Sequence, residues 1–167
     1  TPGNSSFNPT TEKAYEGSYS AKASFTGGTA NAYARCVVTT NWTTGDDVWY
    51  GAAIYLPVGF TQSMQQQVDL MRWDNFSLNN ASQDWGGIII QNSDKKARLK
   101  RFNVNNDYVD LGPTFTFPEG RWVWVEVHQR LSPVSGNSTS GAFSEVYMDN
   151  TKTGESYLPN TYGRDIT

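Results

Sequence analysis

Apolar and polar residues alternate along most of the chain, which is the pattern of β-strands that bury one face. In residues 121–131, the clearest such run, Val123, Val125, Val127 and Leu131 share one parity. The other parity consists of Trp122, Trp124, Glu126, His128 and Arg130. We predict a strand whose valines face the core and whose second face carries chemically active side chains.

Two further strand patterns lie within residues 46–75. Residues 48–56 are apolar on one parity and small or aromatic on the other, as in a strand covered on both faces, and Pro57 and Gly59 follow it. In residues 66–73, Val68 and Leu70 take one face, and the other is formed by Gln67, Asp69, Met71 and Trp73. A carboxamide, a carboxylate and an indole on alternate residues suit a sugar-binding surface, and the alternative is an ordinary solvated sheet face.

The same criteria predict the remaining strands and loops. Strands are expected at residues 18–25, 31–40, 85–91, 95–104 and 142–149. Loops are expected at residues 1–17 and 132–141, and a turn at residues 150–154. About ten short strands separated by turn signals, with no long amphipathic helix, predict an all-β fold, an antiparallel two-sheet β-sandwich.

Length and composition favour a single domain over residues 1–167. The chain has a net charge of -3 and a sequence pI of about 5.1, which argues against a general nucleic-acid binder. No apolar run approaches the roughly 20 residues of a membrane-spanning helix. The single cysteine, Cys36, lies on the apolar parity of its strand and is interpreted as a buried thiol.

Basic residues concentrate in residues 95–104, where Arg98 and Lys100 take the face opposite Leu99 and Arg101. Two interpretations stay open: a charged edge strand that discourages aggregation, or a site for an anionic ligand. Earlier in the chain, the alternation of residues 31–40 directs Arg35 away from the core.

His128, the only histidine, lies between Glu126 and Arg130 on its face of the strand. It suits either a structural or a catalytic role. Walker, dinucleotide-binding, HExxH, paired CxxC and GxSxG motifs are missing, which removes the basis for nucleotide, zinc and serine-hydrolase chemistry. Asp69 with Glu126 would supply the two carboxyl groups of a glycoside hydrolase, and this stays a minor alternative.

The order of the segments resembles that of the concanavalin A-like jelly-roll polysaccharide lyases of the heparin lyase I and glucuronan lyase type. The segments are EGSYSAKASF, NAYARCVVTT, DVWYGAAIYLPVGF, QQQVDLMRW, PEGRWVWVEVHQRL and GAFSEVYMDN. The resemblance covers most of the chain. It also implies a strand before the first segment and one after GRDIT, and we expect a trimmed core that lacks both.

The resemblance implies β-elimination on a uronate-containing, acidic polysaccharide. Arg35 and Gln67 match the residues that bind the sugar carboxylate, and Asp69 stands where the family has histidine. His128 or a tyrosine, Tyr33 with Tyr147 and Tyr162 as alternatives, would then take the proton. The remaining substrate-binding candidates are Asp69, Trp73, Arg98, Lys100, Trp122, Trp124, Glu126 and Arg130.

Glycosylation sequons such as the one at Asn41 favour a secreted, extracellular protein, and we expect no required cofactor. Structural calcium is common in the fold, although the sequence assigns no ligands to it. Two other classes of function stay open: a non-catalytic carbohydrate-binding module on the same scaffold, or a structural subunit whose sheet is completed by a strand from a partner chain. Neither nucleic acid nor membrane is expected as a partner.

Overall fold

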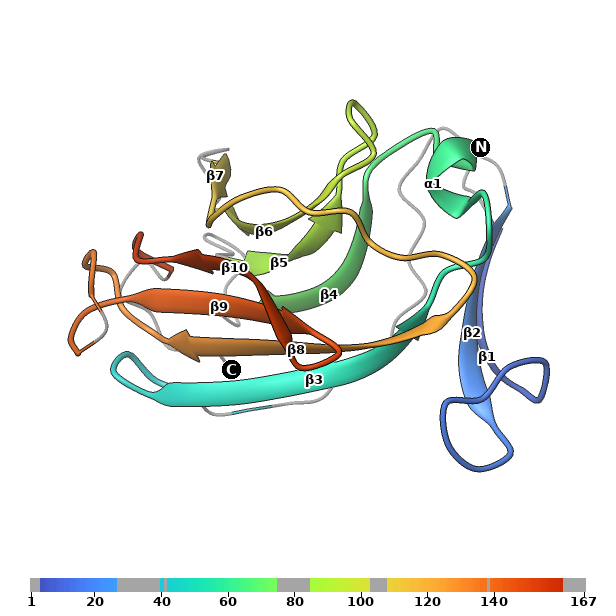
Figure 1. The fold of residues 1–167 in the computed structure, drawn as a ribbon, viewed down its shortest axis with the longest axis horizontal. Coiled ribbons are helices and arrows are strands. Elements are labelled where there is room, and N and C mark those ends of the chain that lie inside the picture. The colour runs from blue at the N-terminus through green and yellow to red at the C-terminus, as the bar shows by residue number, and fades with distance from the viewer. Residues whose placement is uncertain are drawn as a thin grey trace. The chain divides into compact units, whose positions relative to one another are not determined.

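A computed structural model describes residues 4–26, 40, 42–74, 85–102, 108–137 and 139–160. In this part of the chain the elements are antiparallel strands and one short helix, so the prediction of a mostly β protein is confirmed (Figure 1). The chain divides into two compact units, Thr1–Thr39 and Thr40–Thr167. That the two units form one domain stays a prediction.

The first unit contains a two-stranded antiparallel sheet made by β1 (Asn4–Thr10) and β2 (Ser20–Thr26). The loop expected at residues 1–17 is therefore wrong for β1. Apolar side chains are scarce in β1, so its pattern gave no strand signal, and its strand structure comes from main-chain pairing with β2. Beside this ladder, the Lys22 ammonium group lies 2.7 Å from a Glu12 carboxylate oxygen.

The second unit contains two four-stranded antiparallel sheets. One sheet has the order β10–β9–β8–β3, in which the strands are β3 (Asp47–Tyr55), β8 (Trp122–Arg130), β9 (Phe143–Met148) and β10 (Thr151–Ser156). The other has the order β4–β5–β6–β7, in which the strands are β4 (Val68–Asp74), β5 (Trp85–Ile90), β6 (Ala97–Phe102) and β7 (Tyr108–Asp110). The strand predicted at residues 31–40 falls almost entirely outside the described residues, and with it Tyr33, Arg35 and Cys36.

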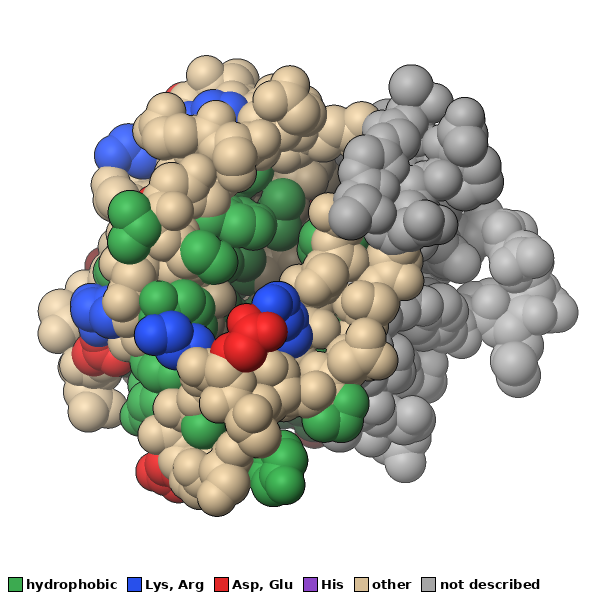
Figure 2. Space-filling view, turned by 90° about the vertical axis from the view of Figure 1, so that its right-hand side faces the viewer, with side chains coloured by type: hydrophobic (Ala, Val, Ile, Leu, Met, Phe, Trp, Pro, Cys, Tyr) green, Lys and Arg blue, Asp and Glu red, His purple; other side chains and the backbone are tan. Residues whose placement is uncertain are grey.

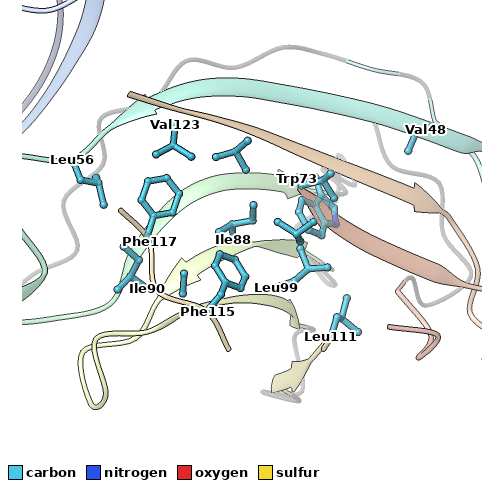
Figure 3. Close-up of a cluster of buried hydrophobic side chains, with 14 of the residues drawn as sticks. Val48, Leu56, Trp73, Ile88, Ile90, Leu99, Leu111, Phe115, Phe117 and Val123 are labelled. Atoms are coloured by element: carbon cyan, nitrogen blue, oxygen red, sulfur yellow. The ribbon is translucent and has the colours of Figure 1, made fainter. Parts of the chain in front are cut away.

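A hydrophobic core joins the two sheets of the second unit (Figure 3). Val123, Val125 and Val127 of β8 are fully buried, and Ile88 and Leu99 of the other sheet belong to the same cluster. Val68 and Leu70 are only partly buried but pack against this cluster. The predicted assignment of the valine parity to the core is thus confirmed, and the opposite parity of β8 faces outward.

A chain of polar groups crosses one end of this core. The Tyr50 hydroxyl donates to Oε1 of Gln129 at 2.7 Å, and Nε2 of Gln129 donates to Oγ of Ser144 at 2.8 Å. Nδ2 of Asn160 also reaches that hydroxyl, at 3.1 Å. Burial raises the pKa of Tyr50, so this hydroxyl stays protonated. Each buried polar group here has a partner, which removes the desolvation cost of burying it.

A tight hairpin connects β9 to β10. Asp149 and Asn150 both have positive φ, 49° and 63°, as a two-residue type I′ turn requires. Residues 151–154, expected to continue the turn, belong to β10 instead. The Asp-Asn pair is itself a hairpin signal, and the strand after it was missed because Thr151–Ser156 is polar and mostly unburied.

Helix α1 (Phe60–Ser63) was not predicted and has a single turn. Two backbone N–H groups, of Gly59 and Thr61, each donate to the Glu119 carboxylate at 2.7 Å. The Thr61 N–H is the main cause of the lowered pKa of Glu119. No helix among the described residues is long and apolar enough to cross a membrane.

Candidate functional site

A β-bulge in β4 decides which of its side chains face outward. Val68 pairs with Ile90 and Asp69 with Ile89, but the register shifts before Met71, which pairs with Ile88. Met71 and Trp73 therefore point to the core side, and Arg72 joins Asp69 on the outer face. Trp73, predicted to stack on sugar, is only 8% exposed and lies in the core (Figure 3). That prediction is wrong because one inserted residue reverses the parity of the strand.

Three polar side chains form a row on the outer side of β4. Nε2 of Gln67, just before the strand, donates to Oδ1 of Asp69 at 3.4 Å. Nη1 of Arg72 lies 3.9 Å from Oδ2 of the same carboxylate. All three residues are exposed. Asp69 thus stands between an amide and a guanidinium group, which offset part of its charge.

Basic residues continue this outer face onto β6. The strand pairing aligns Asp69, Ile89 and Arg98 across the sheet, and aligns Arg72 with Lys100 on either side of Gly87. Because Gly87 has no side chain, nothing projects from β5 between Arg72 and Lys100. Arg72, Arg98 and Lys100 therefore share one face of the sheet.

Arg98 and Lys100 are largely buried, and carboxylates hold both. Arg98 contacts Asp94, and its Nη1 lies 3.3 Å from Oδ2 of Asp110. Nζ of Lys100 lies 3.6 Å from Oδ1 of Asp110. The N–H of Lys96 and the guanidinium group of Arg98 lower the pKa of Asp94. Nε of Arg98 is buried and has no hydrogen-bond partner among the described residues, so a donor remains there for an acceptor.

His128 lies on the outer face of the other sheet. Its Nε2 is 2.6 Å from Oδ1 of Asp47, and its Nδ1 is 3.1 Å from Oε2 of Glu145. The imidazole stacks on Trp49, with ring centroids 3.8 Å apart and planes 12° apart. The Phe143 ring meets it edge-on at 4.6 Å. Both ring nitrogens and one ring face are thus occupied.

Glu145 connects this histidine to further polar groups. The Tyr147 hydroxyl donates to Oε2 of Glu145 at 2.9 Å, and Nζ of Lys152 lies 3.2 Å from Oε1. Burial alone would raise the pKa of Glu145, but hydrogen bonds from His128, Tyr147 and Lys152 lower it overall. Burial, followed by the hydrogen bond to Glu145 and then by the charge of Glu145, raises the pKa of Tyr147. The cluster favours a charged carboxylate and a neutral phenol.

The predicted site residues fall on two faces. Gln67, Asp69, Arg98 and Lys100 belong to the outer side of the β4–β5–β6–β7 sheet. A second group belongs to the outer side of the other sheet: Trp122, Trp124, Glu126, His128 and Arg130. The hypothesis that Gln67 and His128 line one groove is therefore wrong, because β4 and β8 are in different sheets. The same separation removes the pairing of Asp69 with Glu126 as two carboxyls across one bond.

Sequence reasoning missed several residues of these faces. Trp49 lies on the aromatic parity of its strand, which was recognised, but nothing local indicated that it would meet His128. Arg72 was missed because of the bulge. Asp110 follows a stretch with no clear periodicity, and Glu145 lies on a strand whose partner could not be read from spacing. Tyr147 was named only as an alternative catalytic tyrosine, and its contact with Glu145 was not expected.

No group of three or more His, Cys, Asp or Glu residues suited to a metal ion occurs among the residues that the structure describes.

On the side of the molecule drawn in Figure 2, basic side chains lie beside acidic ones, and hydrophobic side chains lie near both. The positively and negatively charged groups visible there are therefore interspersed.

Comparison with known proteins identifies the family. A family model described as "Polysaccharide lyase" matches residues 3–166. Searches of curated proteins and of solved structures found no significant match. Since the family model covers nearly the whole sequence, the chain belongs to the polysaccharide lyase family.

Proposed function

We propose that this protein cleaves a uronate-containing polysaccharide by β-elimination, on the outer face of the β4–β5–β6–β7 sheet. The observation that carries the proposal is the row of Gln67, Asp69 and Arg72 on β4, with Arg98 and Lys100 beside it on the same face. Amides and guanidinium groups are the donors that a sugar carboxylate requires, and family membership implies a polysaccharide substrate.

β-Elimination requires particular chemical groups on this face. The substrate carboxylate must be neutralised so that the neighbouring C5–H becomes acidic. A base removes that proton, the C4–O bond breaks as the C4–C5 double bond forms, and an acid protonates the departing oxygen. Gln67 and Arg72 would bind the carboxylate, and the same role for Arg35 stays an expectation from the family resemblance.

In this proposal a tyrosine, rather than His128, takes the proton. His128 belongs to the other sheet and cannot reach a sugar held at Gln67. Tyr33 is the candidate that the family resemblance implies, and it lies outside the described residues. Relatives of this type have histidine at the position of Asp69. The Asp69 carboxylate would repel the uronate, but Gln67 and Arg72 contact it and offset part of its charge.

Several finer features belong to the same proposal. The two packed antiparallel sheets fit a concanavalin A-like jelly roll, and the substrate would be of the heparin or glucuronan type. The enzyme would act outside the cell, without a required cofactor and with structural calcium as an accessory. A partner strand that completes a sheet stays an alternative for assembly.

The product of the reaction tests the proposal. Incubation with polyglucuronate should yield an unsaturated uronate end that absorbs ultraviolet light, and the rate should fall as salt screens the cations. Mass spectrometry should find fragments whose masses sum to that of the polymer, with no water added. Fragments that have gained one water per cleavage would instead identify a hydrolase.

A further inference from the structure

The outer face of the β10–β9–β8–β3 sheet carries aromatic side chains in register along β3 and β8. Trp49 pairs with His128, Gly51 with Glu126, Ala53 with Trp124, and Tyr55 with Trp122. The Tyr55 and Trp122 rings lie 5.6 Å apart. We call this aromatic surface, from Trp49 to the Tyr55–Trp122 pair, the aromatic lane. It belongs to the sheet that the proposed lyase surface does not use.

Trp49 forms the open end of the aromatic lane. The His128 imidazole covers one side of its indole, and yet the residue remains 55% exposed. Tyr147 stands beside it at 5.7 Å, tilted by 35°. A tryptophan that served only packing would be buried, because burial is where its large apolar surface contributes most to stability. The exposed side of the indole is therefore open for a ligand to stack on it.

The Trp49 indole is held in a fixed orientation. Asp47 and Glu145 each hold one nitrogen of His128, and Phe143 meets the edge of the same ring. Glu145 is in turn fixed by Tyr147 and Lys152. A ligand that stacks on Trp49 meets a surface that needs little further ordering, which lowers the entropic cost of binding.

Glycine at position 51 lets the aromatic surface continue along the strand. A Cβ there would lie 3.3 Å from Cζ2 of Trp124, 3.2 Å from Cγ of Glu126 and 2.7 Å from the Val125 carbonyl oxygen. The side chains of Trp124 and Glu126 therefore lean from β8 toward the main chain of β3. The result is an elongated surface, which suits a linear ligand better than a compact one.

The charges on this face select against an acidic ligand. Among the residues that the structure describes, four carboxylates lie there, those of Asp47, Glu126, Glu145 and Glu155. Lys152 is held between two of them, 3.2 Å from Glu145 and 2.6 Å from Glu155. The Arg130 guanidinium group lies over the Phe143 ring and donates to the carbonyl oxygens of Gly141 and Asn137. Carboxylates accept hydrogen bonds from sugar hydroxyls but repel uronates.

We propose that the aromatic lane is a second saccharide-binding surface, separate from the lyase face, that takes an extended, uncharged glycan chain. Pyranose rings linked through equatorial bonds present flat C–H faces, which stack on Trp49 and Trp124. The hydroxyls at the ring edges then reach carboxylates such as Glu126. Binding there would hold the protein on a neutral polysaccharide while the other face acts on an acidic one.

Calorimetry on the full chain with cellohexaose as the probe tests this proposal. We expect saturable binding that changes little with salt, because no ion pair forms. W49A should raise Kd about tenfold or more, because it removes the most exposed aromatic ring of the aromatic lane. The matched control is Y157A, which removes an exposed aromatic residue outside the aromatic lane and should leave Kd unchanged. Equal Kd values for the parent and W49A, or no binding by the parent, would overturn the proposal.

Two further measurements keep the test independent of how well W49A folds. In nuclear magnetic resonance spectra of the parent protein, cellohexaose should shift the Trp49 indole N–H and the Gly51 amide. Hexaglucuronate should leave both signals in place. Shifts produced by the uronate and not by cellohexaose would place the acidic substrate on this face and contradict the proposal.

Discussion

The outer faces of the two four-stranded sheets differ in chemistry, although strands in both show the same apolar alternation. On the β4–β5–β6–β7 sheet, Arg72, Arg98 and Lys100 gather beside Gln67, with carboxylates as their partners. On the β10–β9–β8–β3 sheet, an exposed Trp49 and the aromatic residues of β8 lie among carboxylates. We propose on this basis that the first face binds an anionic polymer and the second an uncharged one.

The difference shows why one list of sugar-binding residues is misleading for this chain. Most candidates were chosen because their strand parity faces away from the core, and a sandwich has two such faces. The salt dependence of binding distinguishes the two faces, because screening weakens the binding of a uronate to cations and has little effect on stacking.

The largest expected effect is on stability, and it concerns Trp73, which the bulge in β4 places in the core. W73A should lower the free energy of unfolding by roughly 3–5 kcal/mol, because it removes a core indole. W49A, at an exposed indole, should cost less than about 1 kcal/mol. Urea denaturation measures both. Similar losses for the two variants would contradict the placement of Trp73 in the core.

Gly86 should be nearly as sensitive, because the Trp73 indole packs directly over it. A Cβ at Gly86 would lie 2.3 Å from Cζ2 of Trp73. G86A should therefore cost roughly 1–3 kcal/mol of unfolding free energy. The control is G154A, whose new Cβ meets nothing closer than Pro113 Cδ at 3.7 Å. A neutral G86A would mean that Trp73 lies elsewhere.

Removing the exposed cation of the first face should weaken uronate binding. R72A should raise the Kd for hexaglucuronate about tenfold, or about 1.4 kcal/mol, and should reduce its salt dependence. R72K keeps the charge and should lose less. R121A serves as the control, because it removes an exposed arginine that pairs with Asp149 and not with Asp69. An equal loss in R121A would show that net charge alone governs binding.

A smaller effect is expected at Glu145 and should depend on pH. Because the folded-state pKa of Glu145 is lowered, its charged form stabilises the fold above the unfolded-state pKa, and this contribution disappears as pH falls through the folded-state value. E145Q should therefore be less stable than the parent by roughly 1 kcal/mol at neutral pH. The gap should close in acid, as followed by urea denaturation across pH. A gap that stays constant would show that the charge of Glu145 contributes nothing.

Much of the fold could be predicted from the sequence, because alternation reports directly on burial. Val123, Val125 and Val127 were placed correctly on that basis. The reversal at Trp73 could not be predicted, because a bulge is a property of the pairing between β4 and β5. The polar strands β1 and β10 were missed because main-chain pairing, rather than apolar burial, defines them.

The site was harder to predict than the fold. Local pattern shows that Gln67 and His128 both face outward, but it does not show that their strands belong to different sheets. Contacts such as that of Trp49 with His128 join residues far apart in the sequence, and only the strand register brings them together.

The central claim, that β-elimination occurs on the β4 face, is tested most directly by comparing Q67A with H128Q in turnover of hexaglucuronate. Formation of the unsaturated product should be followed by ultraviolet absorbance. The account predicts that Q67A lowers kcat/KM roughly a hundredfold, through loss of a donor to the substrate carboxylate, while H128Q stays within a few-fold of the parent. Loss of activity in H128Q with normal turnover in Q67A would place the chemistry on the other sheet and contradict the account.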